Sequence, residues 1–237
     1  HLAALAGAQM KPVTMELGGH GPVIVCPDAD LDMAAARLAA AKFRNAGQVC
    51  IAPTRFLLHR DIAPAFVEKF KARMSARKIG SGLQDGGTMG PVVSERRLKA
   101  LTDLVEDARS KGAELWRPEI AMPNKGFFFP PTLVRKPRLD MRLLNEEPFG
   151  PIAIMDEYSE LESAVREANR LPYGLAAYVY TRDERTERLP GEALEAGTVA
   201  VNHHGLGAPA VPFGGMTDSG PGPAGCPDPP RAHPLIR

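Results

Sequence analysis

The sequence predicts an α/β fold in which a mainly parallel sheet is flanked by helices. Short apolar runs alternate along the chain with longer helix-like segments, and we find no internal repeat. Parallel strands are buried on both faces and are joined by helical crossovers, so this alternation is typical of such a sheet. The 237 residues, 44% of them hydrophobic, are enough for one large domain or a domain and a half.

The predicted strands are short apolar runs bounded by glycine, proline or polar residues. The first is expected to be buried and to end at Gly18-Gly19. The predicted strands cover residues 12–17, 23–25, 54–58, 152–155, 176–180 and 199–201, and two further apolar runs, 127–129 and 132–134, flank a pair of prolines.

The predicted helices have helical spacing of apolar residues or recognisable caps. Asp28 or Asp30 is expected to cap an alanine-rich helix that ends near Gly47, and Ser94 to cap a helix that Gly112 stops. Pro64 falls in the first turn of another, where its missing N–H costs little. The other predicted helical stretches are 1–9, read as the tail of a helix that begins before His1, 61–78, 161–169 and 184–195.

Composition limits the classes of partner. A net charge of +1 provides no basic surface for nucleic acid or an anionic membrane. No apolar stretch reaches transmembrane length, and no signal peptide opens the chain. The missing initiator Met suggests a fragment or a clipped start. Cys26, Cys50 and Cys226 form no disulfide framework, which suggests a reducing compartment, and we expect a cytoplasmic protein.

Cys50 and Glu16 are the candidate catalytic residues. Cys50 follows a predicted helix and a Gly-Gln-Val turn, where a thiol can stand exposed in a cleft and attack a carbonyl carbon. Glu16 ends a predicted strand, where a carboxylate often faces the site crevice. Each has an ordinary alternative, because a lone cysteine is often a small buried hydrophobe and a strand-end glutamate often lies on the surface. Their pairing favours thioester chemistry, with the carboxylate activating water.

Four motifs resemble those of the NAD(P)-dependent aldehyde dehydrogenases and occur in the same order. They are MELGGH from Met15, FRNAGQVC from Phe43, NEEPFGP from Asn145 and PFGG from Pro212. The 34 residues that separate Glu16 from Cys50 (50 − 16) also resemble the family. The first two motifs are most similar to the succinate-semialdehyde dehydrogenase branch, and the resemblance covers residues 1 to about 220.

This resemblance implies roles for individual residues. Cys50 matches the nucleophile, whose backbone N–H would be one oxyanion donor, and Glu16 the base that activates water for thioester hydrolysis. The expected cofactor is NAD or NADP, with Glu147 holding the nicotinamide ribose hydroxyls and Phe149 packing near the nicotinamide. Leu17 and Gly18 are the other cofactor-binding residues that the resemblance implies. Glu147, Phe149, Leu17 and Gly18 all lie in the quoted motifs.

The substrate is expected to be a small aldehyde such as succinate semialdehyde. Arg44 matches an arginine that binds the distal carboxylate of the substrate in that branch, although a solvated or structurally paired arginine is an open alternative. A serine that assists it in some relatives is absent, because Gly207 and Ala208 occupy that region. Ala52 stands where some relatives carry a second cysteine.

Histidines offer a weaker functional hypothesis. His20, His203 and His204 could suggest a metal site or a Cys–His hydrolase, but no metal-ligand spacing accompanies them, so we expect no metal. Cys26 lies in an apolar run and is expected in the core, and Cys226 lies in the proline-rich tail.

The resemblance implies three parts: a remnant of a Rossmann-like cofactor domain at 1–18, a catalytic domain at 19–204 and a partly irregular segment at 205–237. The last is rich in proline and glycine, and we expect it to form no helix or inner strand and its final dozen residues to be poorly ordered. Thr217 and Pro223 depart from the family pattern there. The final run CPDPPRAHPLIR bears no likeness to the family's closing strand, as a shifted reading frame near residue 221 would cause. Relatives form homodimers or homotetramers, but this chain lacks much of that surface. A catalytically inactive remnant, acting only as an interaction module, is therefore the alternative.

Overall fold

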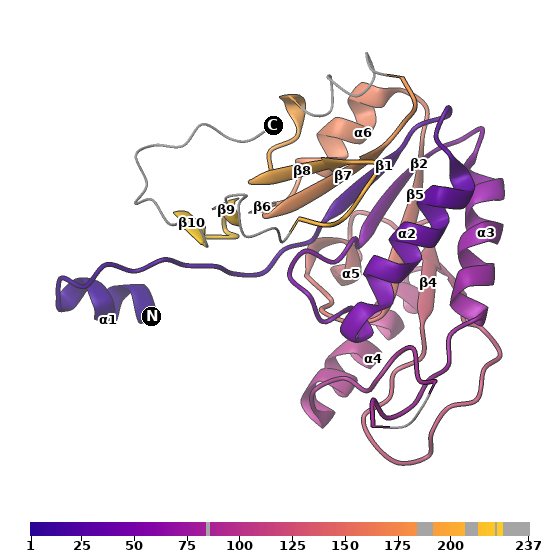
Figure 1. Ribbon diagram of the computed structural model, residues 1–237, viewed down its shortest axis with the longest axis horizontal. Coiled ribbons are helices and arrows are strands. Elements are labelled where there is room, and N and C mark those ends of the chain that lie inside the picture. The colour runs from indigo at the N-terminus through magenta and orange to yellow at the C-terminus, as the bar shows by residue number, and fades with distance from the viewer. Residues whose placement is uncertain (84–85, 184–191, 207–212, 221, 225–237) are drawn as a thin grey trace.

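A seven-stranded sheet forms the centre of the computed structural model, which describes the chain except residues 84–85, 184–191, 207–212, 221 and 225–237. Its strand order is β3-β4-β5-β2-β1-β7-β8 (Figure 1). All neighbours pair in parallel except β3 with β4. The predicted, mainly parallel sheet is therefore confirmed. The strands are β1 (Pro22–Val25), β2 (Arg55–His59), β3 (Glu114–Trp116), β4 (Thr132–Arg135), β5 (Ile152–Tyr158), β7 (Ala176–Tyr180) and β8 (Thr198–Val201).

Helices cover both faces of this sheet. Asp30, not Asp28, caps α2 by accepting a hydrogen bond from the Met33 N–H, and Ser94 caps α4 as predicted. Gly112 follows α4 with φ +87°, a conformation that favours glycine. The helices are α1 (Leu2–Ala8), α2 (Leu31–Phe43), α3 (Ala63–Ser75), α4 (Glu95–Ser110), α5 (Arg142–Asn145) and α6 (Leu161–Ala168).

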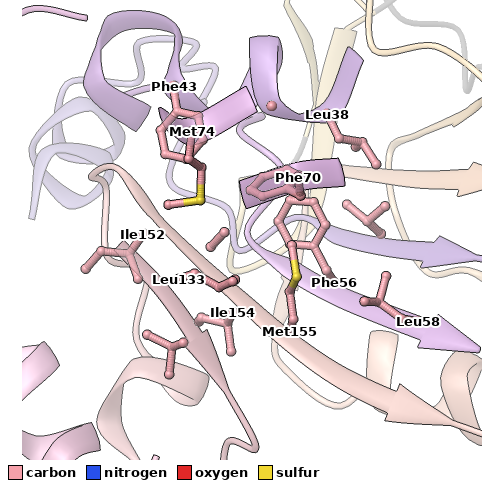
Figure 2. Packing of buried hydrophobic residues seen from close by; sticks show 14 of the residues in the cluster. Leu38, Phe43, Phe56, Leu58, Phe70, Met74, Leu133, Ile152, Ile154 and Met155 are labelled. Carbon is pink, nitrogen blue, oxygen red and sulfur yellow. The ribbon is translucent and has the colours of Figure 1, made fainter. Parts of the chain in front are cut away.

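The core divides into two clusters, which lie on opposite sides of the sheet at β1, β2 and β7. Along β2, Phe56 and Leu58 point into the cluster under α2 and α3, whereas Leu57 points into the other cluster, with Ala164 of α6. Phe56 and Phe70 meet edge to face, with ring centroids 5.3 Å apart (Figure 2). Burying each such side chain contributes about 1.5–3 kcal/mol to stability. The loops before and after these strands therefore rest on a rigid base.

The segment 12–17 forms no strand, so that prediction is wrong. It is largely exposed, and α1 before it buries none of its residues. Figure 1 shows α1 standing away from the sheet. Strands are stabilised by pairing, and the backbone bond that ties this segment to the fold runs from the Leu17 N–H to the Ser219 carbonyl, 3.1 Å long.

The C-terminal segment also differs from expectation, because it contributes an inner strand. β9 (Phe213–Thr217) lies between β6 (Tyr173–Gly174) and β10 (Gly222–Ala224) in a small antiparallel sheet. Gly214 of β9 packs closely on Gly197, which precedes β8. A Cβ on Gly197 would overlap the Gly214 carbonyl oxygen, so the absence of side chains lets β9 take this place. Most of the helix predicted at 184–195, and Cys226 with the final dozen residues, lie outside the described part of the chain.

Candidate active site

The loop that carries Cys50 is held in an unusual backbone conformation. After α2 comes a short 3-10 turn, Arg44–Gly47, in which Asn45 and Ala46 have positive φ of 50° and 53°. The Asn45 side-chain amide donates to the Gln48 carbonyl, and the Gln48 amide donates back to the Asn45 carbonyl, both at 3.0 Å. Gln48 also accepts a hydrogen bond from the Val93 N–H at 2.8 Å. These contacts offset the strain of left-handed residues and fix the position of Cys50.

Glycines bring the separate motifs into direct contact. Gly47, with φ +72°, lies so close to Gly150 that a Cβ would overlap the Gly150 carbonyl oxygen. Gly18 lies equally close to the Glu147 carboxylate, and the Gly19 N–H donates to Glu147 Oε1 at 3.2 Å. Side chains larger than hydrogen would separate these loops. The glycines therefore explain how Glu147 comes to lie beside the Cys50 loop.

A cavity of about 410 Å³ lies where these loops meet. Its lining contains both predicted catalytic residues and all four predicted cofactor-binding residues, together with Arg97 of α4: Glu16, Leu17, Gly18, Cys50, Arg97, Glu147 and Phe149. The structure thus brings six predicted residues together from three separate stretches of the chain.

Arg97 is the lining residue that sequence reasoning missed. It donates to the Pro148 carbonyl at 3.3 Å, and its guanidinium lies 5.6 Å from the centroid of the Phe149 ring. Phe149 itself has a strained backbone, with φ 44°. An arginine near the start of an amphipathic helix carries no sequence signal that separates it from a solvated one.

The Cys50 thiol is protonated at neutral pH in this conformation. Burial raises its pKa to about 11, and the hydrogen bond to the Glu16 carboxylate and the charge of that carboxylate add to the rise. The N–H groups of Ile51 and Cys50 itself act in the opposite direction. Burial also raises the pKa of Cys26 to about 11. Access distinguishes the two cysteines, because Cys26 is 1% exposed in the core whereas Cys50 is half-buried and faces the cavity.

Burial also shifts the pKa values of Glu147, which lines the cavity, and of Lys42, whose charge acts on it. Burial raises the pKa of Glu147, opposed by the Gly19 N–H and by the positive charges of Lys42 and Arg97. Lys42 is 1% exposed, and burial lowers its pKa to about 7. Its ammonium donates to Thr54 Oγ1 at 3.3 Å. Lys42 therefore belongs to the interior, on the helix face that also carries the buried Ala35 and Leu38.

Arg44 lies in a different cavity, of about 380 Å³, beside the same loop. Val49 and Ile51, which flank Cys50, line this second cavity, as do Tyr178 and His204. The Tyr178 hydroxyl donates to the Ile51 carbonyl at 2.5 Å. The Cys50 loop therefore separates the cavity that contains Glu147 and Phe149 from the one that contains Arg44.

The other two histidines that the sequence singled out, His20 and His203, do not line either cavity. His20 is buried, its Nε2 lies 3.1 Å from the Leu143 carbonyl, and burial lowers its pKa well below the usual value. His203 is exposed and accepts a hydrogen bond from the Gly205 N–H. Within the described residues, no group of three or more histidine, cysteine or acidic side chains is placed to hold a metal ion. Nor does any helix there have the length and apolar character needed to cross a membrane.

The structure thus places a thiol and a carboxylate in one cavity, beside close-packed glycines, on a mainly parallel sheet. The profile of the aldehyde dehydrogenase family matches residues 1–229. The chain belongs to the aldehyde dehydrogenase family, as its motifs predicted.

Relatives within the family include several succinate-semialdehyde dehydrogenases. Succinate-semialdehyde dehydrogenase [NADP(+)] 1 of Mycobacterium tuberculosis is 38% identical over 221 residues, which are 93% of this chain and 48% of that protein. The 4-(hydroxymethyl)benzenesulfonate dehydrogenase of Comamonas testosteroni is 45% identical over 222 residues, 94% of this chain and 46% of that one. The chain thus spans about half the length of the curated relatives it matches.

Solved structures share the fold. Succinate-semialdehyde dehydrogenase from Burkholderia pseudomallei superposes with a TM-score of 0.90 at 39% identity, over 94% of this chain and 46% of that one. An NADP-dependent enzyme of E. coli gives a TM-score of 0.91 at 37% identity, over 95% and 47%. The arrangement of strands and helices described above is therefore that of aldehyde dehydrogenases.

Proposed function

We propose that this chain carries the thioester-forming part of an NAD(P)-dependent aldehyde dehydrogenase, with Cys50 as nucleophile and Glu16 as the base that activates water. The observation that carries the proposal is the cavity in which Cys50, Glu16, Glu147 and Phe149 converge. The Glu16 carboxylate is close enough to accept the hydrogen bond of the Cys50 thiol. A water molecule that attacks an acyl group on the sulfur would therefore lie within reach of the same carboxylate.

The lining of this cavity fits the nicotinamide riboside half of NAD or NADP. Glu147 uses Oε1 to accept the Gly19 N–H. Its other oxygen is left to accept hydrogen bonds from ribose hydroxyls. Phe149 supplies a flat apolar ring to the same cavity as Glu147 and Cys50. The oxidised cofactor, when bound, supplies the hydride acceptor.

The protein's part in the reaction begins with Cys50. Its thiolate adds to the aldehyde carbon, forming a C–S bond and an oxyanion that the Cys50 N–H stabilises. Loss of hydride from the same carbon, to the acceptor that a bound cofactor would supply, would re-form the C=O bond and leave a thioester on Cys50. A water that gives a proton to Glu16 adds to the thioester. The C–S bond breaks, the acid is released and the thiolate is regenerated.

Cys50 must lose its proton before the first step. With a pKa of about 11, roughly one thiol in ten thousand is ionised at pH 7. Movement of the Glu16 carboxylate away from the sulfur would remove both its hydrogen bond and its charge, and would lower the pKa. Glu16 lies in the exposed segment that one backbone bond ties to the fold, so such a movement breaks few contacts.

The substrate we propose is a small aldehyde with a second, anionic group. Arg44 lines the cavity on the other side of the Cys50 loop, and no hydrogen bond or ion pair joins its guanidinium to another described residue. The names of two relatives point to anionic compounds, a carboxylate in succinate semialdehyde and a sulfonate in 4-(hydroxymethyl)benzenesulfonate. A guanidinium binds either group through paired hydrogen bonds.

One observation favours the alternative of a non-catalytic interaction module. Apolar side chains stand exposed along α1 and the segment after it, namely Leu2, Leu5, Met10, Val13 and Leu17. A row of exposed apolar residues is typical of a surface that contacts another polypeptide. This alternative predicts no chemistry at Cys50, so an assay of that thiol separates the two functions.

An activated ester tests the proposal without cofactor. With 4-nitrophenyl acetate, the chain should release a burst of nitrophenolate of about one per molecule as Cys50 is acylated, followed by slower turnover. Cys50→Ser should abolish the burst, and Cys26→Ser should not change it. A burst of the same size in Cys50→Ser would contradict the proposal.

A further inference from the structure

The second cavity combines several basic side chains. Arg44 and His204 line it, and the charges of Arg37 and His203 reach His204 as well. Among the described residues, none of the charges that act on His204 is acidic. A cluster of positive and potentially positive groups beside an open cavity, without a carboxylate to neutralise them, favours the binding of an anion.

Tyr178, which lines this cavity, and Arg37, whose charge reaches it, already have hydrogen-bond partners. The Tyr178 hydroxyl donates to the Ile51 carbonyl, and Arg37 donates to the Asn202 carbonyl. His204 differs, because its Nδ1 is buried and has no hydrogen-bond partner. Leaving a buried polar atom unpaired costs about 1–3 kcal/mol, so such atoms generally meet a ligand or water. The guanidinium of Arg44 likewise has no hydrogen-bond or ion-pair partner within the described part of the chain.

We infer that His204 is a second substrate-binding residue, which donates its Nδ1–H to the anionic group that Arg44 also binds. The inference rests on the proposed function, because it places the anionic end of the aldehyde on the side of the Cys50 loop away from Glu147. Neutral imidazole donates from one nitrogen and imidazolium from both.

The surroundings of His204 give this site a characteristic pH dependence. Burial, followed by the charges of Arg37, Arg44 and His203, lowers the His204 pKa. The other titratable groups nearby are the hydroxyls of Tyr178 and Tyr180 on β7, whose pKa values are raised by burial. They stay neutral at pH 6–8. A bound anion opposes the effect of the arginines and favours imidazolium, so binding takes up a proton. Affinity for an anion should therefore increase as pH falls.

Calorimetry with benzenesulfonate tests the inference, because a sulfonate stays ionised across the range used. The 237-residue chain should bind it several-fold more tightly at pH 6 than at pH 8, and should not bind uncharged benzenesulfonamide at the same concentration. His204→Ala should weaken binding about tenfold, the loss expected for one hydrogen bond to a charged group. His204→Gln keeps a donor but no titrating ring. It should bind within about threefold of the unaltered chain at pH 8 and lose the increase at pH 6.

Two control variants separate the possible failures. His203→Gln removes the neighbouring exposed imidazole, whose charge has the smallest of the named effects on His204, and should change the affinity and its pH dependence much less than His204→Gln does. Arg44→Ala should abolish binding. If Arg44→Ala abolishes it while the His204 variants behave like the unaltered chain, the inference about His204 is wrong and the anion site remains. If Arg44→Ala binds normally, the anion site is overturned together with the inference. Thioester chemistry at Cys50 is judged independently by the ester assay.

Discussion

Glu16→Gln should change two properties of Cys50 in opposite directions. The substitution removes the negative charge but keeps the shape of the side chain. In the structure, the hydrogen bond and the charge of Glu16 both raise the Cys50 pKa, after the larger effect of burial. Without the charge, the pKa should fall from about 11 towards the ordinary value near 8.5, without reaching it, because burial remains. The thiol should therefore ionise more readily in the variant.

The size of the effect follows from this pKa. Each unit by which the pKa falls increases the thiolate fraction at pH 8 about tenfold, while the intrinsic nucleophilicity of the thiolate falls about threefold. Alkylation of Cys50 should therefore become about threefold faster per unit. Hydrolysis of an acyl group on Cys50 should slow about a hundred- to ten-thousandfold, because the base is gone.

Two measurements on the same variant check these directions. The rate of carboxamidomethylation of Cys50, followed from pH 7 to 10 by peptide mass mapping, gives the pKa. The burst and the steady rate with 4-nitrophenyl acetate give acylation and hydrolysis. Glu147→Gln is the matched control for alkylation, because this second cavity carboxylate is not among the largest contributions to the Cys50 pKa. If Glu16→Gln instead slows alkylation and removes the burst, Glu16 deprotonates Cys50, and our division of roles is wrong.

Four further outcomes are expected. Limiting iodoacetamide should label Cys50 in preference to Cys26, and the reverse order would exclude Cys50 as the accessible nucleophile. Calorimetry should detect weak or no NAD(P) binding to this chain, because its cavity offers contacts to the nicotinamide riboside half; micromolar affinity would contradict that view. Lys42, with a pKa lowered to about 7 against about 10.4 when unfolded, binds fewer protons in the folded chain, so stability should rise with pH between these values. In the unaltered chain the urea midpoint should therefore rise between pH 7 and about 8.5, and Lys42→Met should flatten this rise. The range ends at about 8.5 because cysteines ordinarily begin to ionise there. If the midpoint of Lys42→Met rises with pH as steeply as before, the lowered pKa of Lys42 is refuted. Gly47→Ala should lower the free energy of unfolding by more than Gly112→Ala does. Both glycines have a positive φ, where alanine would be strained by about 1–3 kcal/mol, but no atom lies near the Cβ position of Gly112. Equal losses would show that the contact between Gly47 and Gly150 is dispensable.

The sequence predicted the strands whose two faces are both buried. It did not predict which segments find a neighbouring strand to pair with. The run 176–180 is apolar throughout because each face of β7 packs on a core cluster. The segment 12–17 has a similar pattern, yet it has no neighbouring strand among the described residues and stays exposed. β9 was missed for the opposite reason. Its glycines, which argue against a strand when taken alone, are needed where Gly214 packs on Gly197.

The candidate site shows the same division. Cys50, Glu16, Glu147 and Phe149 were predictable because each lies in a short motif in which residue type and order carry the signal. Arg97 and His204 were not assigned roles, because each lies where no motif distinguishes it from a surface residue. Their positions follow from the approach of α4 to Phe149 and of the loop after β8 to the end of α2.

The sequence by itself determined the family, the order of the main helices and strands and the residues that carry the proposed chemistry, because these depend on local patterns and short motifs. Only the tertiary structure decided that two cavities lie on opposite sides of the Cys50 loop and that the thiol is protonated against Glu16. It also decided that Lys42 is buried. Burial and proximity between residues far apart in the chain create these properties, and no local pattern encodes a distance of that kind.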